Sequence, residues 1–418
     1  MNVFSITLKS LRQRRTGVAL TVITIALSVF LLLGVERVRT DARQSFASTV
    51  SGTDLLVGAR SGPVNLLLYA VFHVGEATNN ITWKTYQDIR AMPEVAWTVP
   101  LSLGDSHRGF RVTGTTSDFF LHYRYGARKP LAFAAGHAFS DLYDAVIGAE
   151  VARRLHYGVG DTIILAHGLG GPATALHSDK PFRISGVLVP TGTPVDATIA
   201  VSLEAIEAIH VDWRSGVRLP GMTSSADQAR HRDLTPKAIT ACLVGLRSRL
   251  SAFAVQRALN EYPDEALLAV LPGVALGELW HLLGTAENAL RVVSAMVVLV
   301  GISGMLTALL AMLNERRREM AVLRAVGAST RTVFALLVAE STLLTLIGMV
   351  AGGVLLFAVT LLAHDYLLAN AGIVLNATPS AQEGWLLLSV LVLGSLSGCI
   401  PGWIAYRRSL ADGLQVRL

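Results

Sequence analysis

The stretch NERRREMAVLRAVGAST, Asn314–Thr330, places a cluster of arginines and glutamates between two long apolar runs. The preceding run, Val292–Leu313, contains no charged residue, and the following run, Thr332–Ala363, contains only Glu340. A helix needs about 20 predominantly apolar residues to cross a bilayer, and both runs are long enough. The charged stretch is therefore interpreted as a connection between two membrane spans, held at a membrane surface.

Two further apolar runs bring the number of expected spans to four. The chain is 52% hydrophobic and only 16% charged, whereas charged residues make up about a quarter of an average soluble domain. The first run is longer than the apolar core of about 7–15 residues typical of a signal peptide, so we expect a retained anchor. The expected spans are residues 17–35, 292–313, 332–363 and 385–406.

The distribution of basic residues predicts which side each connection faces. Cytoplasmic loops of membrane proteins are enriched in Lys and Arg, and the connection 364–384 contains neither. We therefore expect segments 1–16, 314–331 and 407–418 in the cytoplasm and segments 36–291 and 364–384 outside. The residues that carry this signal are Lys9, Arg12, Arg14, Arg15, Arg316, Arg317, Arg318, Arg324, Arg331, Arg407, Arg408 and Arg417.

The block 36–291 is long enough to fold around a core of its own. Strand-like runs such as 99–103 and 182–189 alternate with helix-like runs such as 82–92 and 149–155, which predicts an α+β domain. Ser202 is placed to cap a helix that begins at Leu203. The residues after the first span and the segment 277–291 are expected to prolong the first two spans as helical stalks.

The segment Ser61–Gly75 is apolar on all sides but too short to cross a bilayer. Such runs form either a buried core helix or an interfacial segment. Both interpretations stay open here. In the second, the side chains that contact a substrate or a surface would be Leu66, Leu67, Tyr69 and Phe72.

The sequence contains no pattern typical of a catalytic or metal centre. It has no phosphate-binding loop and no nucleophile elbow, so no catalytic residue is assigned. Ten of the eleven histidines lie in the block 36–291, and His167 and His177 flank a glycine-rich loop. Their spacing matches no common metal motif, so no metal ligand is assigned. Glu340 lies within a span, where an acid can serve as a proton or ion relay or as a structural contact.

With these features in place, the chain resembles the MacB/FtsX-type (type VII) ABC transporter permeases, including the lipoprotein-releasing LolC/LolE permeases. The charged stretch followed by a long span is similar to their signature. The order of one span, a large outer domain and three further spans is similar to their layout, and this similarity extends over essentially the whole chain. The segments VIGAEVARRLHYGVGDTIIL, Val146–Leu165, and FRISGVLVPTGTPVDATIAVSLEAIEAIH, Phe182–His210, resemble their periplasmic core domain.

The resemblance implies an α-helical protein of the bacterial inner membrane, with four transmembrane helices and a large α+β, MacB-like periplasmic core domain between helices 1 and 2. It implies that ATP and Mg²⁺ are bound by a separate ABC ATPase in two copies, with no cofactor in this chain. A second permease copy or paralogue and membrane lipid are the other expected partners, and nucleic acid is not one. Whether a periplasmic adaptor or an outer-membrane channel takes part stays open.

The implied function is export or extraction of an amphiphile such as a lipoprotein, a peptide or an antibiotic, driven by mechanotransmission. The alternative is an FtsX-like regulator that activates an extracytoplasmic partner without moving solute. The segment 314–331 would be the coupling helix, because it combines possible ion pairs with an apolar strip at helical spacing. Simple anchoring of its arginines in anionic lipid is the competing interpretation. The expected coupling residues are Glu315, Arg316, Arg317, Arg318, Glu319, Met320, Leu323, Arg324, Val326 and Gly327.

Overall fold

The computed structural model describes residues 15–168, 176–214, 217–218, 224–315, 328–371 and 380–412. The chain divides into two compact units. Among the described residues, the helical unit contains 15–41, 284–315, 328–367 and 380–412. The sheet unit contains the described residues between Ala42 and Leu283, together with 368–371. The division falls inside two long helices, one after Asp41 and one before Gly284.

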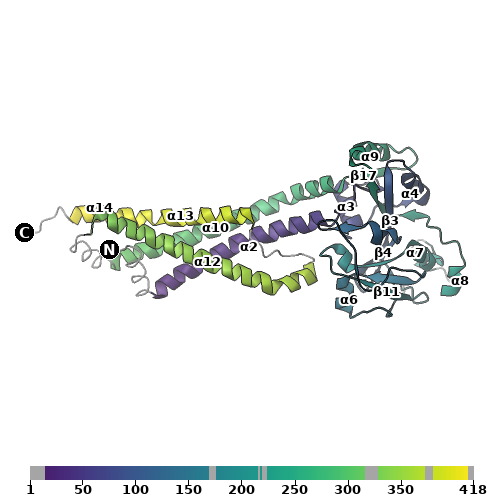
Figure 1. Ribbon diagram of the computed structural model, residues 1–418, viewed down its shortest axis with the longest axis horizontal. Coiled ribbons are helices and arrows are strands. Elements are labelled where there is room, and N and C mark those ends of the chain that lie inside the picture. The colour runs from purple at the N-terminus through teal and green to yellow at the C-terminus, as the bar shows by residue number, and fades with distance from the viewer. Residues whose placement is uncertain are drawn as a thin grey trace, which may run out of the picture. The chain divides into compact units, whose positions relative to one another are not determined.

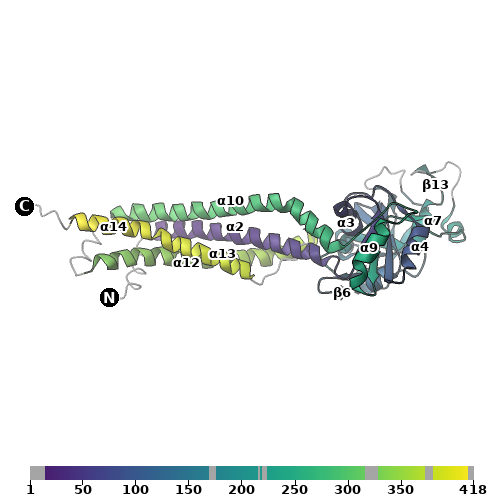
Figure 2. The ribbon, with the colours of Figure 1, turned by 90° about the horizontal axis from the view of Figure 1, so that it is seen from above.

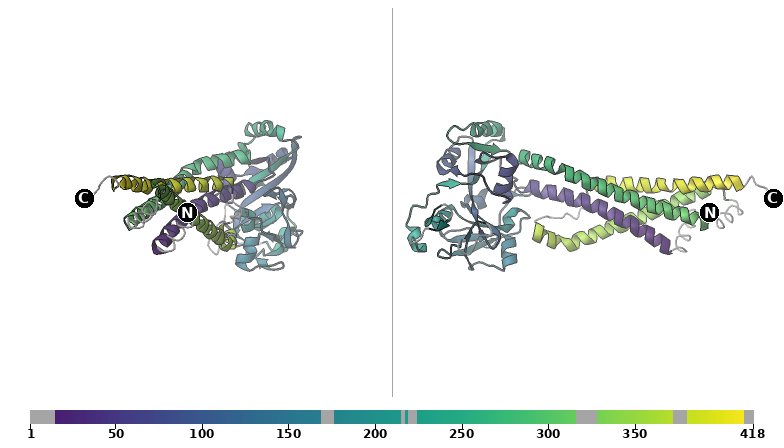
Figure 3. Two further views of the ribbon diagram at one scale, coloured as in Figure 1. Left: turned by 60° about the vertical axis from the view of Figure 1, so that its left-hand side comes forward. Right: turned by 180° about the vertical axis from the view of Figure 1, so that it is seen from behind.

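Four helices are long and apolar enough to cross a membrane: Arg15–Ala47, Pro272–Ala311, Thr330–Ala363 and Ala381–Ala405. They run side by side in the helical unit (Figures 2 and 3), and they confirm the four-span fold class. The fourth is built from two helices in succession. The helices are α2 (Arg15–Ser48), α10 (Pro272–Glu315), α12 (Thr330–Ala371), α13 (Ala381–Ser397) and α14 (Cys399–Asp412).

The fourth span is broken at Gly398 because Pro401 follows it. A proline inside a helix has no N–H to donate and its ring collides with the carbonyl four residues earlier, which here belongs to Ser397, the last residue of α13. In the first turn of α14, which starts at Cys399, the same proline is tolerated. The break thus follows from the local sequence.

Successive spans of the helical unit run in opposite directions, with α13 and α14 following one another in the fourth (Figure 1). The start of α2, the end of α10, the start of α12 and the end of α14 therefore lie at one end of the bundle.

Small residues bring the helices of this unit close together. A Cβ added at Gly301 would lie 2.6 Å from the Ser28 hydroxyl oxygen, and one at Gly398 would lie 2.0 Å from the Ser341 hydroxyl oxygen. Lipid is as apolar as the helices themselves, so association inside a bilayer depends on this kind of close packing rather than on the hydrophobic effect. Around these contacts lie Ile25, Val29 and Leu33 of α2 with Met305, Leu344 and Val390 of the other helices.

The sheet unit is built on an eleven-stranded mixed sheet (Figure 1). Its strand order is β17-β1-β16-β3-β4-β12-β8-β11-β7, with β10 paired to β3 and β9 paired to β11. The pairs β12–β4 and β11–β8 are parallel, and the others are antiparallel. The 13-residue strand β3 joins two halves of the sheet, because it pairs with β16 through Val95–Leu101 and with β4 through Ser102–His107. The mixture of strands and helices confirms the α+β prediction.

The strands are β1 (Leu55–Ala59), β2 (Ile81–Thr82), β3 (Val95–His107), β4 (Phe110–Thr115), β5 (Arg124–Tyr125), β6 (Lys129–Pro130), β7 (Phe133–Gly136), β8 (Asp144–Ile147), β9 (Thr162–Ile163), β10 (Ala166–His167), β11 (Phe182–Leu188), β12 (Thr198–Ser202), β13 (Trp213–Arg214), β14 (Val217–Arg218), β15 (Ala238–Ile239), β16 (Ala241–Leu246) and β17 (Leu267–Val270). The helices are α3 (Pro63–Val71), α4 (Trp83–Arg90), α5 (Asp118–His122), α6 (Ala149–Leu155), α7 (Leu203–His210), α8 (Ala226–Arg230) and α9 (Ala252–Asn260), with 3₁₀ turns η2 (Pro194–Ala197) and η3 (Arg249–Ser251).

Local capping explains where several of these helices begin. The Ser202 hydroxyl accepts a hydrogen bond from the Ala205 amide at 3.1 Å, so α7 starts where the sequence predicts. Thr82 caps α4 in the same way, through the Thr85 amide at 3.3 Å. Each cap satisfies an amide that would otherwise lack a partner in the first turn.

Two adjacent glycines of α12 provide a test of the close packing. A Cβ at Gly352 would lie 2.6 Å from the backbone oxygen of Ala26, whereas one at Gly353 would meet nothing within 4 Å. Gly352→Ala should destabilise the bundle by about 1–3 kcal/mol through overpacking. Gly353→Ala should be neutral or stabilising by up to about 1 kcal/mol, because alanine favours the helix. Thermal unfolding of the two full-length variants in detergent measures the difference, and equal midpoints would contradict this packing.

Candidate functional site

Most of the expected coupling residues lie outside the described part of the chain. Arg316, Arg317, Arg318, Glu319, Met320, Leu323, Arg324, Val326 and Gly327 all fall within residues 316–327. Glu315 is the last residue of α10, and its side chain is not among those described. The assignment of a coupling helix to this segment therefore stays a prediction.

The element that follows the segment starts with a cap. The Ser329 hydroxyl accepts a hydrogen bond from the Thr332 amide at 3.3 Å, and the Ser329 carbonyl accepts from the Thr332 amide at 3.0 Å. Ser329 thus caps the start of α12. α12 begins at Thr330, so the last two residues of the predicted coupling segment 314–331 belong to this helix.

At its far end, α2 packs into the sheet unit through aromatic side chains. The ring of Phe46, near the end of α2, lies 4.7 Å from the ring of Phe72 and 5.7 Å from the ring of Trp280 in the first turns of α10. The Arg43 guanidinium lies 5.2 Å from the centre of the Trp280 ring. Offset aromatic pairs and cation–π contacts of this kind add to the stabilisation from buried area. We call Arg43, Phe46, Phe72 and Trp280 the stalk base.

The apolar segment Ser61–Gly75 forms α3, which supports the stalk base from inside the domain. Leu66 and Leu67 are fully buried, Tyr69 is 2% exposed and Phe72 is 9% exposed. A cavity of about 20 Å³ lies beside Ala70 and Val71, which is room for about one water molecule. This burial favours the core interpretation of the segment. Direct contact of these side chains with a substrate stays a prediction.

A buried ion pair connects α2 with α13 inside the helical unit. Arg37 donates from Nε to Glu383 Oε1 at 2.9 Å and from Nη2 to Glu383 Oε2 at 2.7 Å. The two side chains are only 8% and 6% exposed. Glu383 is held at the start of α13, where its amide donates to the Ser380 hydroxyl at 3.2 Å. A two-pronged arginine–carboxylate pair of this kind fixes both position and orientation.

A second group of charges lies on the same turns of α2 and reaches α10. Arg39 pairs with Glu36 on its own helix and with Glu287 on α10, where Nη1 lies 3.4 Å from Oε2. Together, the two groups link α2, α10 and α13. Sequence analysis did not single out these residues. The sequence signal for these ion pairs was the charged run Glu36–Arg39, which directly follows the first apolar run. That run predicted only a polar stalk.

Glu340 lies inside the helical unit on α12 and is 1% exposed, next to the fully buried Ser341. The Thr342 hydroxyl of the same helix donates to the Ser395 hydroxyl of α13 at 3.0 Å. Glu340 is therefore buried in the helical unit, two residues from a polar contact between α12 and α13. Burial is compatible with both roles considered for it, relay and structural contact.

Three histidines that are far apart in the sequence meet in the sheet unit. His167, His177 and His210 surround Asp105, and their ligand atoms all lie within 4.8 Å of one another. The sequence pattern assigned no metal here because no two of these residues have a motif spacing. Only the pair His167 and His177, on either side of a glycine-rich loop, offered a signal.

These features together define a membrane protein with an extracytoplasmic α+β domain inserted after its first span. The model of the MacB-like periplasmic core domain matches residues 18–262, and that of the FtsX-like permease C-terminal domain matches residues 291–412. The chain belongs to the MacB/FtsX-type family of ABC transporter permeases.

Individual relatives are distant. The macrolide export ATP-binding/permease protein MacB of Nitrobacter winogradskyi is 25% identical over 423 residues, covering 93% of this chain but only 60% of that protein. An uncharacterized ABC transporter permease of Methanocaldococcus jannaschii is 34% identical over 122 residues, 28% of each chain. The periplasmic region of MacB from Actinobacillus actinomycetemcomitans covers 55% of this chain and 94% of that one, at 9% identity and a TM-score of 0.33. The family assignment rests on the two family models.

The Arg37–Glu383 pair yields a first prediction for this site. Arg37→Ala leaves a buried carboxylate without its partner, which should destabilise the helical unit by about 3–5 kcal/mol. The exchanged pair Arg37→Glu with Glu383→Arg should recover part of that loss. Arg257→Ala, which breaks a pair with Glu261 whose side chains are 79% and 65% exposed, should change stability by about 1 kcal/mol or less. Thermal unfolding in detergent ranks the variants, and a stable Arg37→Ala chain would show that the pair is dispensable.

A second prediction concerns α3. Leu67→Asn places an amide in a fully buried site, so the sheet unit should lose about 3 kcal/mol or more of stability. Val74→Asn changes a side chain that is 57% exposed and should have little effect. Limited proteolysis of the full-length variants is the measurement. Unchanged protection of the sheet unit in Leu67→Asn would instead favour the interfacial interpretation of the segment.

Proposed function

We propose that this chain is the permease subunit of an ABC transporter that carries the effect of ATP hydrolysis on a separate ATPase into an extracytoplasmic domain, and so moves an amphiphilic substrate. The observation that carries the proposal is the continuity of two helices. α2 and α10 each run without a break from the helical unit into the sheet unit. Any shift or tilt imposed on them in the helical unit is passed on by the same helix.

The length and stiffness of these helices suit transmission over a distance. α2 has 34 residues and α10 has 44, which at 1.5 Å per residue corresponds to about 50 Å and 65 Å. Bending a helix sharply requires broken backbone hydrogen bonds or an inserted group. A displacement at one end therefore reappears at the other instead of being absorbed.

Two groups of contacts support a defined route for the motion. The Arg37–Glu383 and Arg39–Glu287 pairs link α2 to α13 and α10, so these helices are expected to move as one body. The stalk base then joins α2 to the end of α3 through the tilted rings of Phe46 and Phe72, and α2 to α10 through Phe46 and Trp280. Close packing of this kind has discrete arrangements and transmits displacement rather than deforming smoothly.

The partners follow from the same proposal. ATP and Mg²⁺ would be bound by an ABC ATPase in two copies, which would push on residues 314–331 in the cytoplasm. A second permease copy or a paralogue would complete the complex in the bacterial inner membrane, with both chain termini cytoplasmic as the basic residues predict. Such a complex is compatible with a periplasmic adaptor or an outer-membrane channel as a further partner.

The substrate class is inferred from the relative and the domain size. The Nitrobacter relative is named for macrolide export, and a macrolide is an amphiphile. A domain of the size of the sheet unit offers more surface than a simple regulatory loop needs, which favours transport of an antibiotic, peptide or lipoprotein. An FtsX-like regulator that switches an extracytoplasmic partner is the second candidate.

The coupling helix can be tested by removing its charges. Replacing Glu315, Arg316 and Glu319 by alanine should abolish substrate-stimulated ATP hydrolysis in the reconstituted complex, because the ATPase would no longer dock. The control variant replaces Lys9, Arg12 and Arg14 by alanine, which removes cytoplasmic charge elsewhere. It should keep the stimulated rate if the coupling charges act by docking.

Two outcomes would contradict the assignment. If the coupling variant purifies as an intact complex with normal ATP hydrolysis, residues 314–331 are not the docking element. If both variants lose activity equally, the basic residues act mainly as lipid anchors.

A further inference from the structure

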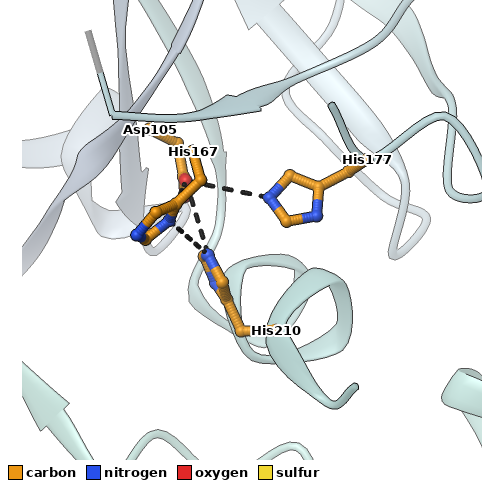
Figure 4. Close-up of side chains that lie close together, drawn as sticks. All are labelled: Asp105, His167, His177 and His210. Atoms are coloured by element: carbon orange, nitrogen blue, oxygen red, sulfur yellow. Dashed lines mark hydrogen bonds and ion pairs between the residues drawn. The ribbon is translucent and has the colours of Figure 1, made fainter. Parts of the chain in front are cut away.

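Four side chains with metal-ligand atoms converge in the sheet unit (Figure 4). They are Asp105 on β3, His167 on β10, His177 after β10 and His210 at the end of α7. Figure 4 shows the three imidazole rings grouped around the Asp105 carboxylate. The cluster plays no part in the coupling route proposed above.

A bulge in β3 turns Asp105 toward the histidines. The register of β3 against β4 shifts between Leu103 and Ser106, so one extra residue is accommodated there. Gly104 supports the bulge with a φ of +149°. As a result, the buried side chains of Asp105, Ser106 and His107 follow one another without the usual alternation. Bulges are common beside functional sites, where they redirect a side chain.

Antiparallel pairing brings both His167 and His177 to the cluster. His167 pairs with Asp105 in the β10–β3 ladder. After residues 169–175, the chain returns so that Leu176 bridges to Ala166 and the His177 amide donates to the Leu165 carbonyl at 2.9 Å. The two histidines that flank the glycine-rich loop thus lie beside each other.

His210 is oriented by its own helix. Its Nδ1 lies 2.8 Å from the Ile206 carbonyl oxygen, so this nitrogen donates its proton to the backbone. Its Nε2 faces the cluster, 3.0 Å from His167 Nδ1 and 3.4 Å from Asp105 Oδ1. A backbone carbonyl that holds the remote N–H of an imidazole is the usual outer support of a histidine metal ligand.

His177 supplies an independent observation. Its side chain is fully buried, and neither ring nitrogen has a hydrogen-bond partner among the described residues. Nε2 lies 4.0 Å from Asp105 Oδ1, so the ring is aimed into the cluster. A buried polar group without a partner costs about 1–3 kcal/mol, and each such case requires an explanation.

We propose that Asp105, His167, His177 and His210 form a binding site for a divalent transition-metal ion, with Zn²⁺ as the best fit. Three imidazole nitrogens and one carboxylate oxygen are a donor set typical of tetrahedral zinc. With zinc–ligand distances of about 2.0–2.1 Å, neighbouring donors in a tetrahedron lie about 3.3 Å apart. The three shortest separations here are 3.0, 3.3 and 3.4 Å.

Surrounding contacts hold the ligands in place. The Trp213 ring lies 4.7 Å from the ring of His177 and 5.6 Å from that of His167, and so forms an aromatic wall. Beyond it, the buried Lys180 ammonium lies 3.1 Å from Asp212 Oδ2. Asp212 also accepts from the Ser224 amide at 2.8 Å. This pair connects the segment after His177 to the segment after His210.

A site with four protein ligands leaves no open position, which is typical of structural rather than catalytic zinc. The ion would cross-link β3, the segment that returns at His177, and the end of α7. His167 and His210 are 38% and 25% exposed at their side chains, so an ion can enter from solvent past them. The metal would therefore stiffen the half of the sheet unit that contains β4 and β12.

Zinc binding by the full-length protein tests the proposal directly. The chain is purified in detergent with a tag that contains no histidine, stripped with a chelator and titrated with Zn²⁺ against a chromophoric competitor. We expect one Zn²⁺ per chain. Co²⁺ as a replacement should give the intense visible absorption bands of a four-coordinate ion.

Matched variants localise the ion. His210→Ala and Asp105→Asn should each weaken Zn²⁺ binding by at least about tenfold. His231→Ala is the control, because His231 also ends a short helix of the same unit but is exposed and lies outside the cluster. It should bind Zn²⁺ like the parent chain. Asp105→Asn preserves side-chain size, so it decides the question if His210→Ala fails to fold.

The proposal is overturned if the parent chain binds Zn²⁺ no more tightly than folded Asp105→Asn or His210→Ala. It is also overturned if the bound Co²⁺ shows only the weak bands of an octahedral ion. The first result would leave the four residues as a hydrogen-bonded histidine–carboxylate group without a metal, and the second would exclude a four-coordinate site. Neither result bears on ATP coupling, which is measured separately.

Discussion

The structure depends on the requirement that every backbone N–H and C=O in a hydrocarbon environment find a partner within its own element. This requirement makes the four spans helical, and the fourth is interrupted only at Gly398, between α13 and α14. In α2 and α10, the helix does not stop where the apolar run ends, and each continues into the sheet unit. The same constraint that makes the spans helical thus applies to two helices whose ends belong to the sheet unit.

Once the spans are helices, specific contacts must hold them together, because lipid offers the apolar side chains an equally good environment. Here glycines bring backbones close, as at Gly352 against Ala26, and buried charges select the partner. The Arg37–Glu383 pair is stable only as a pair, since either residue alone would be an uncompensated buried charge. The helical unit therefore combines close packing with a few polar contacts that link particular helices.

Strand β3 contributes to both the apolar core beside the stalk base and the histidine cluster. Its first half contributes Val99 and Leu101 to the apolar core that also contains Phe72 and receives Phe46 of the stalk. Its second half contains the bulge that directs Asp105 into the histidine cluster. A metal ion bound there would stiffen the far half of the strand whose near half supports the stalk base. The coupling route and the metal site are tested by separate experiments, but both involve strand β3.

The sequence by itself determined the four spans, the α+β character of the inserted domain and the cap at Ser202, because apolar length, periodicity and capping are local properties of the chain. The family was indicated separately, by the resemblance of the charged stretch and of the layout. Only the tertiary structure decided which distant segments contact one another. Arg37 and Glu383 are separated by 346 positions, and Asp105 joins three histidines from β10, the returning segment and α7 without any motif spacing. The burial of Ser61–Gly75 was likewise open, because an apolar run looks the same whether it faces a core or an interface. Ion pairing, metal-ligand convergence and burial depend on how elements pack, and no local pattern of residues encodes that packing directly.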